Sequence, residues 1–229
     1  MNSPTLLLVH GAWGGAWCWR DLRDLASERG FDSIGVDLPS SRLHAGSTTG
    51  LEQDAAEVAR VASTITGPVI LVAHSYGGAV VLEAAAAIRD IERIVFIAAL
   101  VPRQGQSATD VSREVRLRTR LDNAILVEGD HLRLDLDLAP GALYNHLESA
   151  TATWATAQLS TQTIASFRSV RQSEDTNSKR RYIRCSDDHA VDPSLQELMA
   201  MRCEETRELS SDHSPFLSHP RELLDAICE

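Results

Sequence analysis

This chain has no features of a membrane-bound or secreted protein near its start. Its first apolar run, residues 6–9, is too short for a signal peptide or a membrane span. No basic segment precedes that run, as it would in a secretory leader. We therefore expect a soluble, cytoplasmic protein that has no membrane partner.

Positive charge and metal-binding cysteine motifs are also scarce. Lysine and arginine total 22 against 32 acidic residues, and the formal net charge of -10 repels phosphate at long range. Nucleic acid is therefore not an expected partner. The four cysteines, Cys18, Cys185, Cys203 and Cys228, form neither a C-x-x-C pair nor a metal-ligand spacing. We expect them to be reduced thiols, and we expect no metal and no organic cofactor.

What the sequence does contain is an alternation of strand and helix patterns. Its 229 residues, 43% of them hydrophobic, are enough for one sizeable core. Such alternation predicts βαβ units, with a mostly parallel sheet that helices cover on both faces. The expected strands are 5–9, 31–37, 69–73 and part of 91–100, and the expected helices are 17–29, 51–65 and 77–89.

The alternation is interrupted between residues 103 and 167, where the sequence has helical stretches but no strong strand. It resumes with expected strands at 181–185 and 204–209 and expected helices at 193–202 and 220–228. This organisation predicts an α/β core domain made from residues 1–102 and 168–229. A small, mainly helical cap, residues 103–167, is inserted between two strands of its sheet.

Ser75 is the strongest candidate for a nucleophile. It lies in Ala-His-Ser-Tyr-Gly-Gly (73–78), between an apolar strand and an alanine-rich helix. A sharp strand-to-helix turn presents a serine side chain above the sheet, and it requires small residues two positions before and after. Ala73 and Gly77 meet this requirement, although glycine is usual at the first position. The alternative is that Ser75 is an ordinary helix N-cap.

A glycine-rich loop follows the first expected strand as His-Gly-Ala-Trp-Gly-Gly (10–15). Such a loop can direct backbone N–H groups at a developing oxyanion, and the natural pair is Ala12 together with Tyr76, the residue after the nucleophile. We expect His10 to brace the loop rather than to move protons. Trp13 is expected to lie nearest the substrate.

A serine nucleophile needs an imidazole base and a carboxylate to orient it. His213, in Ser-Asp-His-Ser (211–214), lies just past the last expected strand and is the best candidate base. Asp187 and Asp188 both follow the strand that ends at Cys185, and the residues alone leave both open as the acid.

Together these segments resemble the plant methylesterase and hydroxynitrile lyase branch of the α/β hydrolases and its bacterial esterase relatives. The resemblance is carried by residues 8–13 and 15–19, the segment 73–78, the acid strand 182–188 and the histidine segment 211–214. It implies an α/β-hydrolase fold with the cap at residues 103–167. It also assigns the acid to Asp188, the second of the two aspartates, and allows a homodimer.

Two departures from the lyases of this branch favour an esterase. The lyases typically have threonine at the position of Ala12, and lysine directly after the histidine, where this chain has Ser214. The expected function is therefore hydrolysis of carboxylic esters with small to medium apolar acyl or aryl groups. The residues expected to line the substrate pocket are Trp13, Leu121, Leu126, Tyr144 and Trp154.

Other functions remain open on this sequence. Lyase, lactonase or C–C bond hydrolysis could use the same Ser75, His213 and Asp188 set. A protein of another class, a non-catalytic small-molecule receptor on a hydrolase fold, would bind a ligand without turnover.

Overall fold

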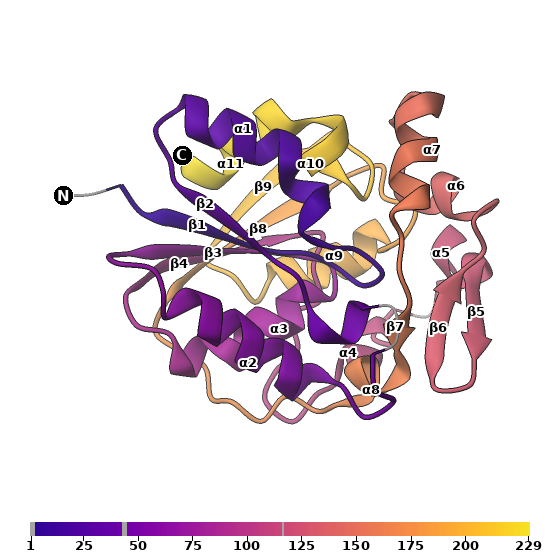
Figure 1. Ribbon diagram of the computed structural model, residues 1–229, viewed down its shortest axis with the longest axis horizontal. Coiled ribbons are helices and arrows are strands. Elements are labelled where there is room, and N and C mark those ends of the chain that lie inside the picture. Colours follow the sequence, from indigo (N-terminus) through magenta and orange to yellow (C-terminus); the bar gives the residue numbers. More distant parts are fainter. Residues whose placement is uncertain (1–2, 43–44, 116) are drawn as a thin grey trace.

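The computed structural model describes residues 3–42, 45–115 and 117–229. Its central feature is a six-stranded sheet in which every described strand pairing is parallel, in the order β2-β1-β3-β4-β8-β9 (Figure 1). This agrees with the fold class expected from the sequence. The strands are β1 (Thr5–Val9), β2 (Ser33–Val36), β3 (Val69–His74), β4 (Ile91–Ile97), β8 (Lys179–Cys185) and β9 (Glu205–Leu209).

Strand β1 shows why the sheet is buried on both faces. All of its residues are apolar apart from Thr5, and successive side chains point to opposite faces. Leu6 and Leu8 pack into one apolar core, and Leu7 and Val9 pack into the other. A strand between two cores must be apolar almost throughout, which is how the run reads in the sequence.

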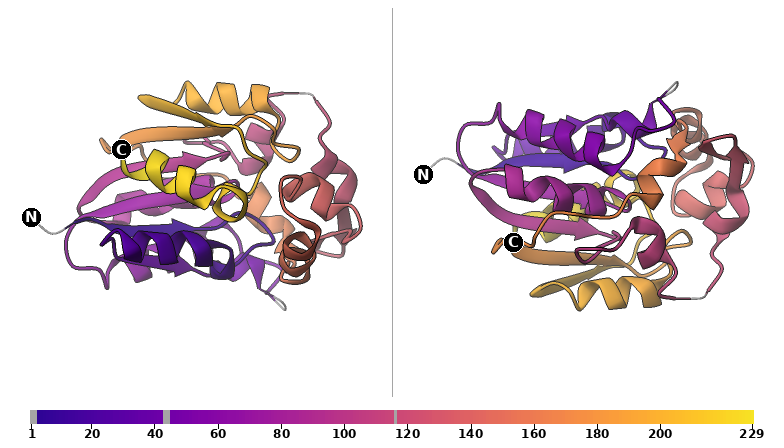
Figure 2. Two further views of the ribbon diagram at one scale, coloured as in Figure 1. Left: turned by 90° about the horizontal axis from the view of Figure 1, so that it is seen from above. Right: turned by 90° about the horizontal axis from the view of Figure 1, so that it is seen from below.

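Helices cover both faces of the sheet (Figure 2). One face is covered by α1 (Arg20–Glu28), α10 (Pro215–Ser218) and α11 (Pro220–Cys228). The other face is covered by α2 (Leu51–Ala62), α3 (Gly77–Ala84) and α9 (Pro193–Ala200). The helix expected at 17–29 begins as a 3-10 turn over Ala16–Trp19, and α10 was not expected from the sequence.

The register of β1 and β3 determines where a site can form. Val9 pairs with Ala73, so the two strands end side by side at the same edge of the sheet. The glycine-rich loop after β1 and the turn after β3 are consequently neighbours. Ligands bind at the carboxyl edge of such parallel sheets, and that edge faces the segment inserted between β4 and β8 (Figure 1).

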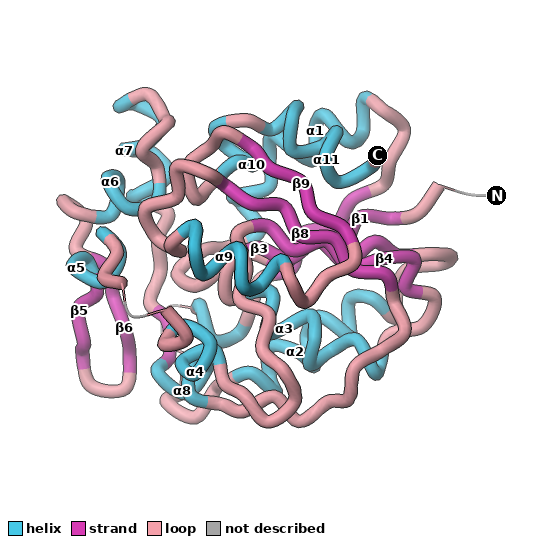
Figure 3. The backbone as a smooth tube through the Cα atoms, turned by 180° about the vertical axis from the view of Figure 1, so that it is seen from behind, coloured by secondary structure: helices cyan, strands magenta, loops and turns pink. Residues whose placement is uncertain are grey.

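The inserted segment contains more strand than the sequence predicted. Its elements are α4 (Ala108–Ser112), α5 (Arg120–Ala124), β5 (Ile125–Glu128), β6 (His131–Leu134), α6 (Ala139–Leu143), α7 (Ser149–Ala157), β7 (Gln162–Thr163) and α8 (Ile164–Arg168). The three strands form an antiparallel sheet, with the β5–β6 hairpin standing beside the main sheet (Figure 3). The expectation of no strong strand here was therefore wrong, because Gly129, at φ +59°, closes a tight hairpin turn.

Among the described residues, no helix is both long enough and apolar enough to cross a lipid bilayer.

Candidate active site

Ser75 occupies a strained turn between β3 and α3. Its φ of +52° is in the left-handed region, which costs a residue with a side chain about 1–2 kcal/mol. Backbone hydrogen bonds hold the turn: Ser75 N donates to Ile97 O at 3.1 Å, and Ser75 O accepts from Leu100 N at 3.0 Å. Such over-determined strain is typical of functional sites.

Close backbone approach around this turn explains the glycines that follow Ser75. A Cβ atom on Gly77 would lie 2.7 Å from His10 O, and one on Gly78 would lie 2.3 Å from Leu100 O. Both distances are shorter than a carbon–oxygen contact allows. The small residues of the motif are therefore required by packing against the ends of β1 and β4.

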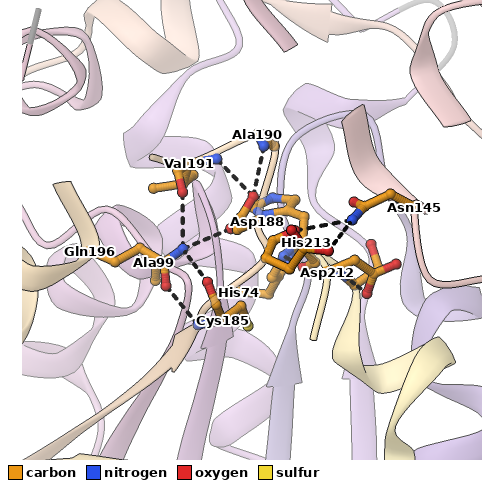
Figure 4. A network of polar contacts seen from close by, with 12 residues as sticks. His74, Ala99, Asn145, Cys185, Asp188, Ala190, Val191, Gln196, Asp212 and His213 are labelled. Atoms are coloured by element: carbon orange, nitrogen blue, oxygen red, sulfur yellow. Dashed lines mark hydrogen bonds and ion pairs between the residues drawn. The ribbon is translucent and has the colours of Figure 1, made fainter. Parts of the chain in front are cut away.

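His213 and Asp188 form a buried pair (Figure 4). His213 Nδ1 lies 2.7 Å from Asp188 Oδ2, to which Gln196 Nε2 also donates at 3.0 Å. The other oxygen, Oδ1, accepts from the backbone N–H groups of Ala190 at 2.7 Å and Val191 at 2.9 Å. Hydrogen bonds from so many donors suit an ionised carboxylate, which can hold the imidazole in one orientation.

Asp187, the alternative acid, makes its contacts with other residues than His213. Its side chain is 53% exposed and lies 2.7 Å from His146 Nε2. Asn145 Nδ2 donates to its carboxylate at 3.1 Å. The hydrogen bond from His146 holds the pKa of Asp187 below its usual range. The structure thus brings Asp188, and not Asp187, into contact with His213.

Ser75 lines two cavities of very different size. The smaller has a volume of about 30 Å³, and His213, Ala12 and Tyr144 also line it. The larger has a volume of about 490 Å³ and is mostly apolar. Ile125, Leu132, Ile164 and Phe167 of the inserted segment line it, together with Leu100 and Leu195 of the core.

Of the two residues whose amides are expected to bind an oxyanion, Ala12 lines the smaller cavity and Tyr76 directly follows Ser75 in the chain. Ala12 lies in the loop after β1, and Tyr76 immediately precedes α3, where the helix dipole favours negative charge. Within residues 3–42, 45–115 and 117–229, neither N–H donates a hydrogen bond to another protein group. Both N–H groups are therefore available to donate hydrogen bonds to an oxyanion that develops beside Ser75.

Two further histidines brace the site. His10 Nε2 accepts from Leu38 N at 3.1 Å, so its Nδ1 carries the proton and donates to Gly11 O at 2.7 Å. His74 Nε2 donates to His213 O at 2.8 Å. Burial lowers the pKa of His10, and it lowers the pKa of His74 well below 6.5. Both rings are therefore neutral supports, and the contact of His74 with the backbone of His213 was not foreseen.

The predicted pocket residues divide into two groups. Trp13 and Leu121 line both cavities, and Tyr144 lines the smaller one. Leu126 and Trp154 line neither cavity, which corrects the expectation for them.

Physical reasons explain both exceptions. Side chains alternate along β5, so Ile125 and Val127 face the larger cavity while Leu126 points away and is 45% exposed. The Trp154 and Trp17 rings pack edge-to-face, at 5.4 Å between ring centroids, and the Arg20 guanidinium lies over the Trp154 ring.

No cluster of three or more histidine, cysteine or acidic side chains suited to a metal ion occurs in the described part of the chain.

Comparison with curated proteins gives plant enzymes at low identity. The putative chloroplastic methylesterase 11 of Arabidopsis thaliana is 28% identical over the whole of this chain. The chain spans only 64% of that relative, and 56% of the putative methylesterases 13 and 15 of the same plant. Norfluorocurarine synthase 2 of Strychnos sp is 26% identical, with 97% of this chain and 93% of that protein covered.

Solved structures agree on the architecture. A pyrethroid hydrolase from Sphingobium faniae superposes with a TM-score of 0.83 at 21% identity, covering 98% of this chain and 95% of the other. A methylesterase from Arabidopsis superposes with a TM-score of 0.80 at 23% identity, covering 97% and 96%. At these identities the superpositions establish the fold alone. The Alpha/beta hydrolase family model matches residues 6–226, nearly the whole chain, and the chain therefore belongs to the alpha/beta hydrolase family.

Proposed function

We propose that this protein is a carboxylic ester hydrolase in which Ser75 is the nucleophile, His213 the base and Asp188 the orienting acid. The observation that carries the proposal is the buried His213–Asp188 pair, 2.7 Å apart, at a cavity that the strained Ser75 also lines. Relatives named as methylesterases support the same reaction class.

The reaction begins when Ser75 Oγ attacks the ester carbonyl carbon and His213 takes the hydroxyl proton. Asp188 stabilises the resulting imidazolium through Nδ1, and the N–H groups of Ala12 and Tyr76 stabilise the oxyanion. The C–O bond to the alcohol then breaks, and His213 returns its proton to the leaving oxygen. Water adds to the acyl-enzyme by the same steps, which releases the carboxylic acid and restores Ser75.

The unequal cavities suggest the substrate class. The leaving oxygen must lie near His213 to receive a proton, and His213 lines only the smaller of the two cavities. The smaller cavity, about 30 Å³ against about 490 Å³, favours a small alcohol over a bulky one. The acyl group then occupies the apolar cavity of about 490 Å³. The preferred substrate is therefore a methyl ester of an apolar or aryl carboxylic acid.

Two sets of assays test this proposal. Turnover of p-nitrophenyl butyrate by wild type and Ser75→Ala tests the nucleophile, and a loss on the order of 10⁴-fold is expected. Methyl, ethyl and butyl esters of phenylacetic acid test the cavities, and kcat/KM should fall as the alcohol grows. Equal rates for Ser75→Ala, faster cleavage of a cyanohydrin or a lactone, or ligand binding without turnover would each contradict the proposal.

A further inference from the structure

A second buried carboxylate, Asp54, lies behind the turn that carries Ser75. It belongs to α2, on the apolar stripe that also contains Leu51 and Val58, and it is fully buried. Asp54 Oδ1 accepts from Ser40 N at 2.9 Å. Oδ2 accepts from Ser40 Oγ at 2.5 Å and from the Tyr76 hydroxyl at 2.8 Å. The proposed Ser75, His213 and Asp188 chemistry makes no use of this group.

The hydrogen bonds continue from Ser40 through Gln162 of β7. Gln162 Nε2 donates to Ser40 Oγ at 2.8 Å and to Ser166 Oγ at 2.6 Å. Gln162 Oε1 accepts from Ser41 Oγ at 2.5 Å and from the backbone N–H of Trp13 at 3.3 Å. Every hydrogen-bonding position of the Gln162 amide is thereby filled, although the residue is buried.

Asp54 determines the direction of this chain of hydrogen bonds. An ionised carboxylate can only accept, so the Ser40 hydroxyl must donate to it and must receive the Gln162 NH₂ group. The Gln162 oxygen is consequently the atom that faces Trp13 N. Without an obligate acceptor at position 54, the Ser40 hydroxyl could rotate and no longer receive the Gln162 NH₂ group. Only the Trp13 N–H and the Ser166 hydroxyl, which donates to Thr163 O, would then fix the orientation of the Gln162 amide.

Both branches from Asp54 end at the proposed oxyanion donors. One holds the side chain of Tyr76, whose N–H is a donor. The other holds the peptide that joins Ala12, the second donor, to Trp13. Trp13 has a φ of +60°, so its backbone needs such support. We propose that Asp54 is a positioning residue that holds both oxyanion amides in their reactive geometry, an inference that rests on the ester hydrolysis proposed above.

Burial and hydrogen bonding act in opposite directions on the pKa of the Asp54 carboxyl. Burial raises the pKa of Asp54, while the hydrogen bonds from Ser40 and Tyr76 and the charge of Arg42 oppose that rise. Burial, together with the nearby Asp54, raises the pKa of the Tyr76 phenol well above 10, so Tyr76 stays a donor.

The test compares Asp54→Asn and Tyr76→Phe with Glu52→Gln, an exposed acid-to-amide change on the same helix. A misplaced oxyanion donor raises the barrier without weakening substrate binding. We expect kcat for p-nitrophenyl butyrate to fall about 10- to 100-fold in the first two variants, with KM changed less than about threefold. Glu52→Gln should match wild type.

A second measurement separates positioning from general destabilisation. A trifluoromethyl ketone forms a tetrahedral adduct with serine, and the adduct places an oxyanion in the hole. Its affinity should fall in parallel with kcat in the Asp54 and Tyr76 variants, whereas the affinity for butyrate, the product acid, should stay unchanged. If Asp54→Asn does not fold, Tyr76→Phe and Gln162→Met each cut one branch and leave the carboxylate in place.

The possible outcomes distinguish the two proposals. Unchanged kcat and ketone affinity in Asp54→Asn and Tyr76→Phe, with activity lost in Ser75→Ala, would overturn the positioning role alone. The same result in Tyr76→Phe and Gln162→Met would overturn it if Asp54→Asn is unfolded. A wild type without esterase activity, or a fully active Ser75→Ala, would overturn the proposed function and this inference together.

Discussion

At the scale of single residues, Asp187 and Asp188 are neighbours with opposite surroundings. Asp188 is buried against His213, whereas the Asp187 side chain is 53% exposed. An amide in place of Asp188 cannot stabilise the imidazolium and can turn its NH₂ toward Nδ1. We expect Asp188→Asn to lower kcat for p-nitrophenyl butyrate about 10⁴-fold, as in other serine triads.

The matched variant Asp187→Asn retains the volume of its side chain and removes an exposed charge. Its hydrogen bonds with Asn145 and His146 hold a loop and do not touch Ser75 or His213. We therefore expect a change in kcat smaller than about tenfold. A larger loss in Asp187→Asn than in Asp188→Asn would refute the assignment of the acid.

The residues alone could not separate these aspartates, since both follow β8. Their difference arises from the loop after Asp188, which turns the N–H groups of Ala190 and Val191 onto its carboxylate. Asp54 was missed for a related reason. Its partners Ser40 and Tyr76 are 14 and 22 residues away in sequence. The sequence did contain a signal for a buried carboxylate, because Asp54 interrupts the apolar stripe of its helix.

At the scale of elements, α3 can approach the sheet only because its first residues lack side chains. A Cβ on Gly78 would lie 2.3 Å from Leu100 O, a backbone atom that cannot rotate away. Gly78→Ala should therefore push α3 away from the segment that follows β4 and lower the free energy of unfolding by about 1–3 kcal/mol. Urea denaturation followed by circular dichroism measures this change.

Gly141 of α6 is a matched control for that substitution. It is also a helical glycine, but the nearest atom to its added Cβ is Arg120 Nη1 at 3.7 Å, an ordinary contact. Because alanine favours helix more than glycine does, Gly141→Ala should be neutral or stabilising by up to about 1 kcal/mol. Equal losses in both variants would mean that close approach to Leu100 is not the cause at Gly78.

The degree of burial explains which strands could be predicted from the sequence. Strands β1 and β3 and the second half of β4, residues 94–97, are apolar runs enclosed by two cores, so their pattern depends little on the rest of the fold. The hairpin β5–β6 has strands of only four residues each, and they are mostly exposed or half-buried, so its pattern is weak. Gly129-Asp130 between two apolar segments was the available signal for a tight turn.

At the scale of the whole molecule, buried neutral histidines make stability depend on pH. Burial lowers the pKa of His74 well below its ordinary value of 6.5, and it lowers that of His10. In the unfolded chain both rings take up protons near pH 6.5, whereas in the folded protein they do so only at lower pH. Their contribution to stability is therefore complete above pH 6.5 and is lost as the pH falls toward their folded pKa values.

His74→Asn isolates one of these two groups. Each proton bound only by the unfolded state changes the free energy of unfolding by about 1.4 kcal/mol per pH unit. Between pH 6.5 and pH 5 we expect the variant to lose stability more slowly than wild type, by up to that amount per pH unit. Urea titrations at several pH values measure both slopes. Parallel slopes would show that His74 binds its proton equally well in the folded protein, and that its ring is not the neutral support of the His213 backbone.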